Sequence, residues 1–282
     1  MIFGEVSLDK AQGCILAHSV RLPDARLKKG LRIGVEEIAQ LRDANLTSVV
    51  AARLEPGDIH EDEAAKRVVE FIRGDHLDTT DPFTGRVNLS ALVEGIFVAD
   101  TRKIIDTNHI DEGVTIATLP PYSRVRTGQL VATVKIIPFA VSDASLLKLK
   151  ATAAADRLRL DVYPFQPKRV GLILSRLPGD TDKLLAKRQE AMAMRVNSLS
   201  GSLIHIAECS HRVDLMVEEL YRAKKKKCDI ILVFGASAII DRKDVIPASL
   251  TASGGTIVQL GMPVDPGNLL LLGSLDDASV IG

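Results

Sequence analysis

The chain contains no tryptophan, and aromatic residues make up only 4% of its 282 positions. Its core must therefore rest on aliphatic side chains, and few rings are available to stack on nucleotide bases. Neither sign of charge dominates, because 36 basic residues balance 36 acidic ones. A net charge of zero provides no broad field that would attract nucleic acid or an anionic membrane surface. Nucleic acid is therefore not an expected partner, and an anionic ligand would need a local site.

Cysteine is also scarce: the chain has three, Cys14, Cys209 and Cys228, which are widely separated and form no C-x-x-C pair. This pattern argues against a structural zinc site and a disulfide scaffold, and it suits a reducing cytoplasm. The first residues lack the basic start and long apolar run of a signal peptide. No stretch approaches the roughly 20 apolar residues of a membrane span. We therefore predict a cytoplasmic protein with no membrane partner.

The length of the chain favours two domains. Residues 1–163 are predicted to form a smaller mixed α/β or β-rich region. Residues 163–167 include two prolines and are predicted to form an extended linker. Residues 74–84 are rich in Asp, Thr, Pro and Gly, which is typical of a loop. The spacing of apolar and β-branched residues predicts helices at 35–44, 61–72 and 146–158, and strands at 49–52, 96–99, 114–119 and 130–137.

Residues 168–282 alternate regularly between apolar strands and helices. The expected strands are 169–175, 203–207, 229–234, 256–260 and 269–272, and the expected helices are 182–200, 213–225 and 245–252. Apolar strands separated by helices are typical of a mostly parallel sheet covered on both faces, so this α/β domain should have three layers. Ligands of such sheets bind outside the carboxyl ends of the strands. The loops after Leu174, Phe234 and Leu260 should therefore meet at one edge.

The loop after Phe234 begins with small residues, Gly235-Ala236-Ser237, and ends with Asp244 at the start of a helix. Small residues after a buried strand let the backbone approach a ligand closely. The alternative is an ordinary strand-to-helix turn, with Asp244 as the helix cap and Ser237 as a turn former. The loop at 261–268 is rich in Gly and Pro and, taken alone, is equally compatible with a plain hairpin or crossover turn.

The order of these segments resembles the molybdopterin-binding domain of molybdenum cofactor biosynthesis proteins. That domain has a strand ending in Thr-Gly, a G-G-x-S/T-x-G loop, an aspartate that opens a helix, and a strand leading into M-x-P-G. The corresponding segments are Leu174-Ser175, Phe234-Gly235-Ala236-Ser237, Asp244-Val245-Ile246-Pro247 and Val264-Asp265-Pro266-Gly267. Molybdopterin adenylyltransferases and molybdenum insertases share this domain. Lys29-Gly30 and residues 37–44 resemble a segment of the insertases. The N-terminal region, residues 1–163, is also similar to the insertases as a whole.

The chain departs from the family pattern in ways that favour binding over catalysis. Phe234 stands in place of the first glycine of the G-G pair, and an isoleucine replaces the glycine expected after Ser237. Asp265 and Asn268 stand where the insertases have basic residues around their Pro-Gly. Residues 187–190, Lys-Arg-Gln-Glu, replace the usual D-x-N segment. These changes preserve a pocket and remove parts of the machinery for adenylyl transfer and metal insertion.

The resemblance implies binding of molybdopterin or the molybdenum cofactor during cofactor biosynthesis or maturation. The implied binding residues are Ser175, Gly235, Ala236, Ser237, Asp241, Asp244, Pro266, Gly267 and Asn268. Asp244 is also the candidate catalytic residue, no metal ligand is assigned, and magnesium is expected only if nucleotidyl transfer is retained. The alternatives are a non-catalytic scaffold or oligomerisation module serving a nucleotidyltransferase domain, and a molybdopterin adenylyltransferase.

The resemblance also implies a homo-oligomer and a fused or partner cytidylyltransferase domain, since the pattern is most similar to a bacterial class with such a domain. Residues 278–282 look like the start of a strand that, in the family, leads into a Leu-Pro-Gly loop lining the pterin site. We therefore expect the domain to be truncated and the natural protein to continue beyond Gly282.

Other polar residues are better explained structurally. His205 alternates with apolar residues and suits a core or edge position, and Lys224 to Lys227 suit a helix C-terminus. The cluster of Asp106, His109, Asp111 and Glu112 is more typical of a solvated loop than of a metal site. Lys135 is compatible with an edge strand or a pocket. Neither Ser175 nor Ser237 has a neighbouring Ser/His/Asp signature, which argues against a hydrolase.

Overall fold

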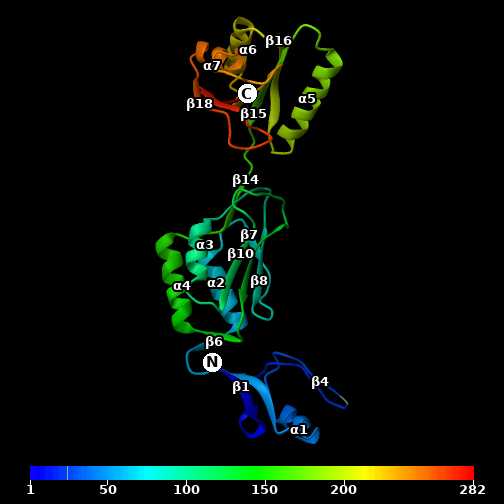
Figure 1. Ribbon diagram of the computed structural model, residues 1–282, viewed down its shortest axis with the longest axis vertical. Helices are drawn as coiled ribbons and strands as arrows, with labels where there is room; N and C mark the ends of the chain where they lie inside the picture. Colours follow the sequence, from blue (N-terminus) through cyan, green and yellow to red (C-terminus); the bar gives the residue numbers. More distant parts are fainter. Residues whose placement is uncertain (24) are drawn as a thin grey trace. The chain divides into compact units, whose positions relative to one another are not determined.

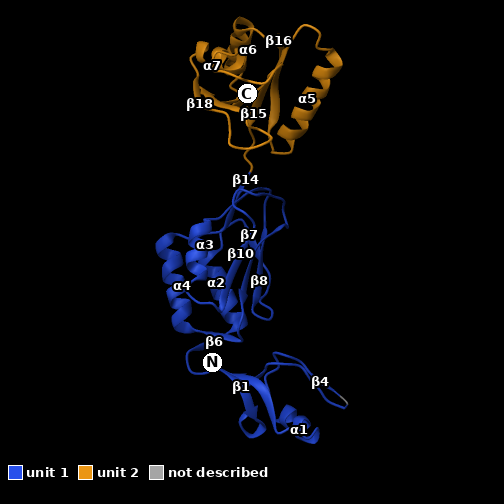
Figure 2. Ribbon diagram, in the orientation of Figure 1, with its two compact units in different colours: residues 1–164 blue, residues 165–282 orange. Residues whose placement is uncertain are grey.

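The computed structural model describes residues 1–23 and 25–282, which divide into two compact units, Met1–Pro164 and Phe165–Gly282 (Figure 2). Helices and strands occur in both units, so the predicted α/β class is confirmed. The division falls inside the segment 163–167 that the sequence marks as a linker. No helix in the described part of the chain combines the length and the apolar character needed to cross a bilayer.

The first part of unit 1 is a small sheet flanked by one helix. Strand β5 lies between β1 and β2 and is antiparallel to both, and β3 pairs with β4. Its elements are β1 (Ile2–Ser7), the 3-10 helix η1 (Leu8–Lys10), β2 (Ile15–Leu16), β3 (Val20–Arg21), β4 (Arg26–Leu27), α1 (Val35–Asp43) and β5 (Ser48–Arg53). Leu41 of α1 is fully buried against Leu8 and Leu16, which explains the helical apolar spacing of residues 35–44.

The second part of unit 1 is built around an antiparallel sheet of order β10-β12-β8-β7. A sheet of order β11-β9-β14 and the pair β13-β6 complete it. The strands are β6 (Asp58–His60), β7 (Leu77–Thr79), β8 (Arg86–Ala91), β9 (Gly95–Val98), β10 (Val114–Thr118), β11 (Arg124–Val125), β12 (Leu130–Ile136), β13 (Ala140–Ser142) and β14 (Asp161–Pro164). The helices are α2 (Glu61–Ile72), α3 (Thr101–Asn108) and α4 (Asp143–Asp156). Val68 and Ile72 of α2 pack in the core with Leu89 of β8 and Val134 of β12.

Two predictions about unit 1 need correction, and one of the two alternatives left open for Lys135 is excluded. The segment 74–84 is not entirely a loop, because it contains β7 at the edge of the main sheet. The linker at 163–167 begins within β14, whose Pro164 pairs with Gly95 of β9. Because β14 is the edge strand of this sheet, the missing amide of proline is tolerated there. Lys135 does not lie on an edge strand: β12 is flanked by β10 and β8, and the Lys135 Nζ lies 3.8 Å from a carboxylate oxygen of Glu61.

Unit 2 is a six-stranded sheet of order β16-β15-β17-β20-β19-β18. Strands β16, β15, β17 and β20 are mutually parallel, and β19 is antiparallel to both of its neighbours. The strands are β15 (Arg169–Arg176), β16 (Ser202–Ser210), β17 (Ile230–Phe234), β18 (Thr256–Leu260), β19 (Leu271–Leu275) and β20 (Ala278–Ile281). The helices are α5 (Asp182–Asn197), α6 (Val213–Lys225) and α7 (Val245–Ala252).

Helices cover both faces of this sheet, with α5 on one side and α6 and α7 on the other (Figure 1). Alternation along β15 explains the two layers of the core. Leu172 and Leu174 pack with Leu185 of α5, while Ile173 between them packs with Met216 of α6 on the opposite face.

The direction of β18 decides where the two candidate loops lie. Because β18 is antiparallel to β19, and β19 is antiparallel to β20, β18 runs in the same direction as β17. The residues after Phe234 and those after Leu260 therefore emerge at the same edge, as predicted. The loop at 261–268 is the connection of the β18–β19 hairpin, one of the two structures that the sequence left open.

Candidate functional site

The loop after β17 passes close to the start of α7 because residue 235 has no side chain. A Cβ atom on Gly235 would lie 2.9 Å from the carbonyl oxygen of Ser237 and 2.9 Å from the Cδ1 atom of Ile246. Within the described residues, the amides of Ser237, Ala238 and Ile239 donate no hydrogen bond. Three consecutive N–H groups are thus available to an acceptor at the carboxyl edge of the sheet.

The hairpin connection at 261–268 forms the opposing segment. Gly267 has a φ angle of +119°, a conformation that side chains disfavour, and the peptide bond between Asp265 and Pro266 is cis. The Met262 amide donates to the carbonyl oxygen of Asn268 over 3.1 Å and closes the loop. Asn268 is exposed at the base of this loop.

The two loops line a common cavity of about 300 Å³, which we call the amide cavity. Four of the predicted binding residues line it: Gly235, Ser237, Gly267 and Asn268. The remaining lining residues are Ala238, Ile239, Ile246, Leu269, Leu270 and Gly282. No charged side chain belongs to this set. Pro266 and Ala236 are adjacent in the chain to lining residues without lining the cavity themselves.

A second hollow of about 590 Å³ shares Ser237 and Ala238 with the first, and we call it the carboxylate cavity. The predicted residues Asp241 and Asp244 line it, together with His211, Ile240 and Lys243. Asp241 and Lys243 are exposed at its rim, and the amide of Lys243 donates to the Asp241 carboxylate over 2.8 Å. The predicted site thus consists of two adjoining hollows that share one wall.

Asp244 is held in place as the N-cap of α7, as the structural alternative proposed. One of its carboxylate oxygens accepts from the amide of Val245 at 2.7 Å, and the other accepts from the amide of Ile240 at 3.3 Å. The negative charge of an aspartate at this position also interacts favourably with the positive end of the helix dipole. Capping fixes the carboxylate but leaves it 18% exposed toward the carboxylate cavity.

Ser175 has a histidine neighbour in space that its sequence context does not reveal. The Ser175 hydroxyl lies 2.6 Å from Nδ1 of His211, and Nε2 of His211 lies 3.8 Å from the Asp244 carboxylate. Ser175 also accepts a hydrogen bond of 3.3 Å from the amide of Ala236. These residues follow or end three neighbouring parallel strands, β16, β15 and β17, so they meet at one edge although they are far apart in sequence.

Despite this geometry, the three residues are not arranged as a hydrolytic triad. Ser175 is fully buried, with 0% of its surface exposed, so no substrate can reach its hydroxyl. The 3.8 Å between His211 and Asp244 also exceeds a hydrogen bond. Ser175 instead joins the end of β15 to the residues after β16 and β17. Ser175 is therefore not placed to act as a hydrolytic nucleophile.

Other titratable side chains of unit 2 lie where β16 packs against α6. His205 and Glu219 are both buried, 3.6 Å apart, and Nε2 of His205 has no hydrogen-bond partner within the described residues. Burial lowers the pKa of the His205 imidazole, and it raises the pKa of the Cys209 thiol to about 11. A neutral imidazole and an un-ionised thiol suit a core position, as the sequence indicated for His205.

The remaining predicted clusters are structural or unassembled. Lys224 lies in the last turn of α6 and forms an ion pair of 2.6 Å with Asp276. No group of three or more His, Cys, Asp or Glu residues suited to a metal ion occurs in residues 1–23 and 25–282. All three cysteines are free thiols.

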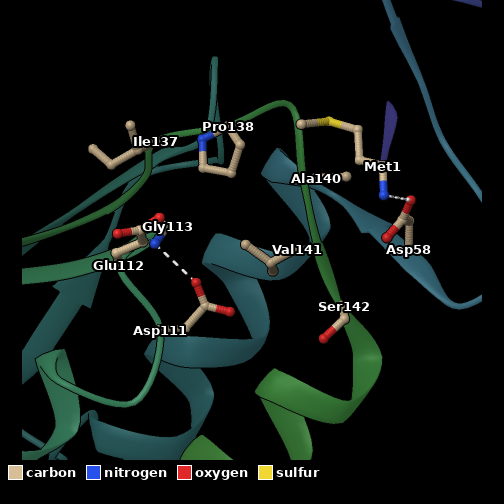
Figure 3. A pocket seen from close by; sticks show the side chains of 10 residues that line it. All are labelled: Met1, Asp58, Asp111, Glu112, Gly113, Ile137, Pro138, Ala140, Val141 and Ser142. Carbon is tan, nitrogen blue, oxygen red and sulfur yellow. Dashed lines mark hydrogen bonds and ion pairs between the residues drawn. The ribbon is translucent and has the colours of Figure 1, made fainter. Parts of the chain in front are cut away.

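Unit 1 contains a hollow of about 560 Å³ between the start of the chain, the 111–113 turn and β13 (Figure 3). Three carboxylates line it, but two already have partners. Asp58 pairs with the terminal amine of Met1 at 2.7 Å, and Asp111 accepts from the amide of Gly113 at 2.8 Å. The amine holds the pKa of Asp58 below its usual range. These contacts fix local turns, and the hollow offers no converging set of donors comparable to that of unit 2.

Comparisons with known proteins identify no family. No family model matches the chain, and no curated protein matches it. Among solved structures, NadC from Streptococcus pyogenes is similar at 14% identity, over 61% of this chain and 74% of that one. Its TM-score of 0.18 is too low to support a shared fold or function.

Proposed function

We propose that unit 2 binds molybdopterin or the molybdenum cofactor, in the biosynthesis or maturation of that cofactor. The observation that supports this proposal is the convergence of residues 235–244 and 261–268 on one edge of the sheet. There, Ser237, Ala238 and Ile239, whose amides donate no hydrogen bond within the described residues, line the amide cavity, and Asp244 lines the adjoining one. Molybdopterin combines a phosphate with a pterin rich in hydrogen-bond donors, and the two hollows offer the complementary groups.

The phosphate suits the amide cavity. Backbone N–H groups bind phosphate well, especially beside a helix N-terminus, and α7 begins here. No side-chain charge opposes an anion among the lining residues of this cavity. Ser237, which lines both hollows, could add its hydroxyl as a further donor. Gly267 and Asn268 would form the opposite wall.

Binding is favoured over catalysis by the position of Asp244. Both of its oxygens already accept backbone hydrogen bonds, from the amides of Val245 and Ile240. The buried Ser175 cannot act as a nucleophile. A homo-oligomer and a partnership with a cytidylyltransferase domain remain part of the proposal that the sequence resemblance supports.

Titration of the purified 282-residue chain with molybdopterin, and separately with ATP, tests the proposal. Saturable pterin binding without ATP turnover is the expected result. Transfer of AMP to the pterin would show an adenylyltransferase instead. Absence of binding to both compounds would favour a non-catalytic scaffold.

Ser237→Ala should weaken molybdopterin binding about fivefold, because one hydrogen bond contributes about 1 kcal/mol. Ser202→Ala is the matched control, since Ser202 is exposed at the amino end of β16, away from the loops. Isothermal titration of both variants measures the difference. Equal affinity of the two variants would assign Ser237 to the turn and not to the ligand.

A further inference from the structure

Arg188 and Phe234 stand at two positions where the chain departs from the family pattern, and their side chains meet in space. Arg188 belongs to the Lys-Arg-Gln-Glu segment 187–190, and Phe234 takes the place of a glycine. The guanidinium carbon of Arg188 lies over the Phe234 ring, 5.1 Å from its centre. A guanidinium above an aromatic face is attracted to it, so the ring holds the Arg188 side chain in place.

This pair lies at the carboxyl edge of the sheet, on the face that α5 covers (Figure 1). Phe234 is the last residue of β17, and it packs with Leu185 in the core between the sheet and α5. The amide cavity belongs to the other face, because its lining residues Ile239 and Ile246 pack in the core that α6 and α7 share. Arg188 and the amide cavity are therefore separate features of one edge.

The guanidinium of Arg188 contains a donor that the protein does not satisfy. Its Nη1 atom is shielded from solvent and has no hydrogen-bond partner among residues 1–23 and 25–282. The side chain as a whole is half-buried, so a ligand can approach it from the surface. A shielded charged donor without an acceptor costs free energy, and such a group in a native protein calls for a water, an ion or a ligand as its partner.

The first half of α5 carries an excess of positive charge. Residues 182–190 contain three basic and two acidic side chains, namely Lys183, Lys187, Arg188, Asp182 and Glu190. The Asp182 carboxylate lies 3.2 Å from a guanidinium nitrogen of Arg176, and Glu208 of β16 lies 3.6 Å from another. These two carboxylates are thus engaged with Arg176. An anion that approaches Arg188 therefore meets a surplus of basic groups.

We propose that Arg188, held on the Phe234 ring, binds a phosphate group of a ligand at the α5 side of the carboxyl edge. The guanidinium presents its N–H donors as a rigid fork that matches two oxygens of a phosphate. The phosphate gives Nη1 the acceptor that it lacks. The excess positive charge of α5 favours a phosphate, which carries up to two negative charges, over a carboxylate, which carries one. This inference goes beyond the proposed function, because it adds a second anion site and does not require a pterin.

Titration of the whole chain with inorganic phosphate, followed by phosphorus NMR, tests the proposal. Wild type should bind phosphate saturably. Arg188→Gln removes the charge and the fork, so phosphate should bind at this site about tenfold more weakly or worse, as expected for lost charge-assisted hydrogen bonds. Phe234→Leu keeps an apolar side chain and removes the ring, and it should weaken the same binding about threefold.

Arg195→Gln is the matched control, since Arg195 is exposed on the same helix and its Nη1 atom contacts the sulfur of Met192 at 3.7 Å. It should keep the wild-type affinity for phosphate. Circular dichroism checks the fold of each variant. If Arg188→Gln proves unfolded, Arg188→Lys replaces it, because lysine retains the charge without the fork and should still bind phosphate more weakly than wild type.

Three results would overturn the inference: no saturable phosphate binding by wild type, an unchanged phosphate affinity in the folded Arg188 variant, or an equal loss in Arg195→Gln. The same variants titrated with molybdopterin separate this site from the proposed function. Molybdopterin affinity should not change in Arg188→Gln, and an equal loss for both ligands would mean that the two sites are one. If molybdopterin does not bind wild type while phosphate still depends on Arg188, the proposed function fails and the phosphate site stands.

Discussion

Ile231→Asp should unfold unit 2 and leave unit 1 folded. Ile231 lies in β17 with 0% of its surface exposed, and it packs with Met216 and Leu220 of α6. An unpaired carboxylate at this position loses its hydration and gains no partner, which costs about 4 kcal/mol or more. A domain of this size is stabilised by only about 5–15 kcal/mol, so most of the stability of unit 2 should be lost.

Hydrogen exchange followed by mass spectrometry measures this effect segment by segment. Amides of 169–281 should exchange rapidly in Ile231→Asp, and amides of α2 and β12 should stay protected, because their core consists of unit 1 residues alone. Ile240→Asp is the matched control, since Ile240 is 85% exposed and the substitution is chemically the same. Loss of protection in both units of Ile231→Asp would contradict independent folding of the two units.

Gly235→Ala should abolish most ligand binding without unfolding the protein. The added methyl group would lie 2.9 Å from the Ser237 carbonyl oxygen, a backbone atom, so the loop itself must move. Displacing it removes the amides of Ser237 to Ile239 from the cavity they border. Losing two such hydrogen bonds, at about 1 kcal/mol each, lowers affinity about 30-fold.

Gly4→Ala controls for the general effect of replacing glycine in this chain, because a Cβ on Gly4 meets nothing within 4 Å. Calorimetric titration with molybdopterin should separate the two variants, and thermal unfolding should show that both remain folded. An unchanged affinity in Gly235→Ala would mean that the loop amides do not contact the ligand.

The pattern of apolar residues was sufficient to predict several elements of unit 2. The bounds of α6 and α7 match the expected helices, and β17 and β18 lie within a residue of their expected limits. Central strands such as β15 and β17 are covered on both faces, so their residues must be apolar and the signal is strong. The positions of the 235–244 and 261–268 loops follow from those strand directions.

His211 was missed because β16 is an edge strand. Its predicted end was residue 207, where the apolar pattern stops, but the strand continues through Glu208 and Cys209 to Ser210. An edge strand is open to solvent, so polar residues do not end it. Those three added residues bring His211 to the carboxyl edge. Attention to the loop after every parallel strand, β16 included, would have identified it.

The same physical reason explains the short strand β7. It pairs only with β8 at the edge of its sheet, and its sequence, Leu77–Thr79, includes an aspartate that points to a loop when it is considered alone. Hydrogen bonding to a neighbour distant in sequence creates this strand. The chemistry of a single segment does not reveal such a neighbour, and the contact between Ser175 and His211 was hidden for the same reason.

The central place of β20 in the sheet has a consequence for synthesis on the ribosome. Strands β15, β16 and β17 can associate as soon as they emerge, because they pair directly with one another. The β18–β19 hairpin, although it emerges earlier than β20, has no hydrogen-bonded neighbour among those strands. The hairpin joins them only when residues 278–281 form β20, which pairs with β17 on one side and β19 on the other. Until that moment the nascent unit exposes two unpaired strand edges, one on each side of the gap, and chaperones or neighbouring chains can bind them.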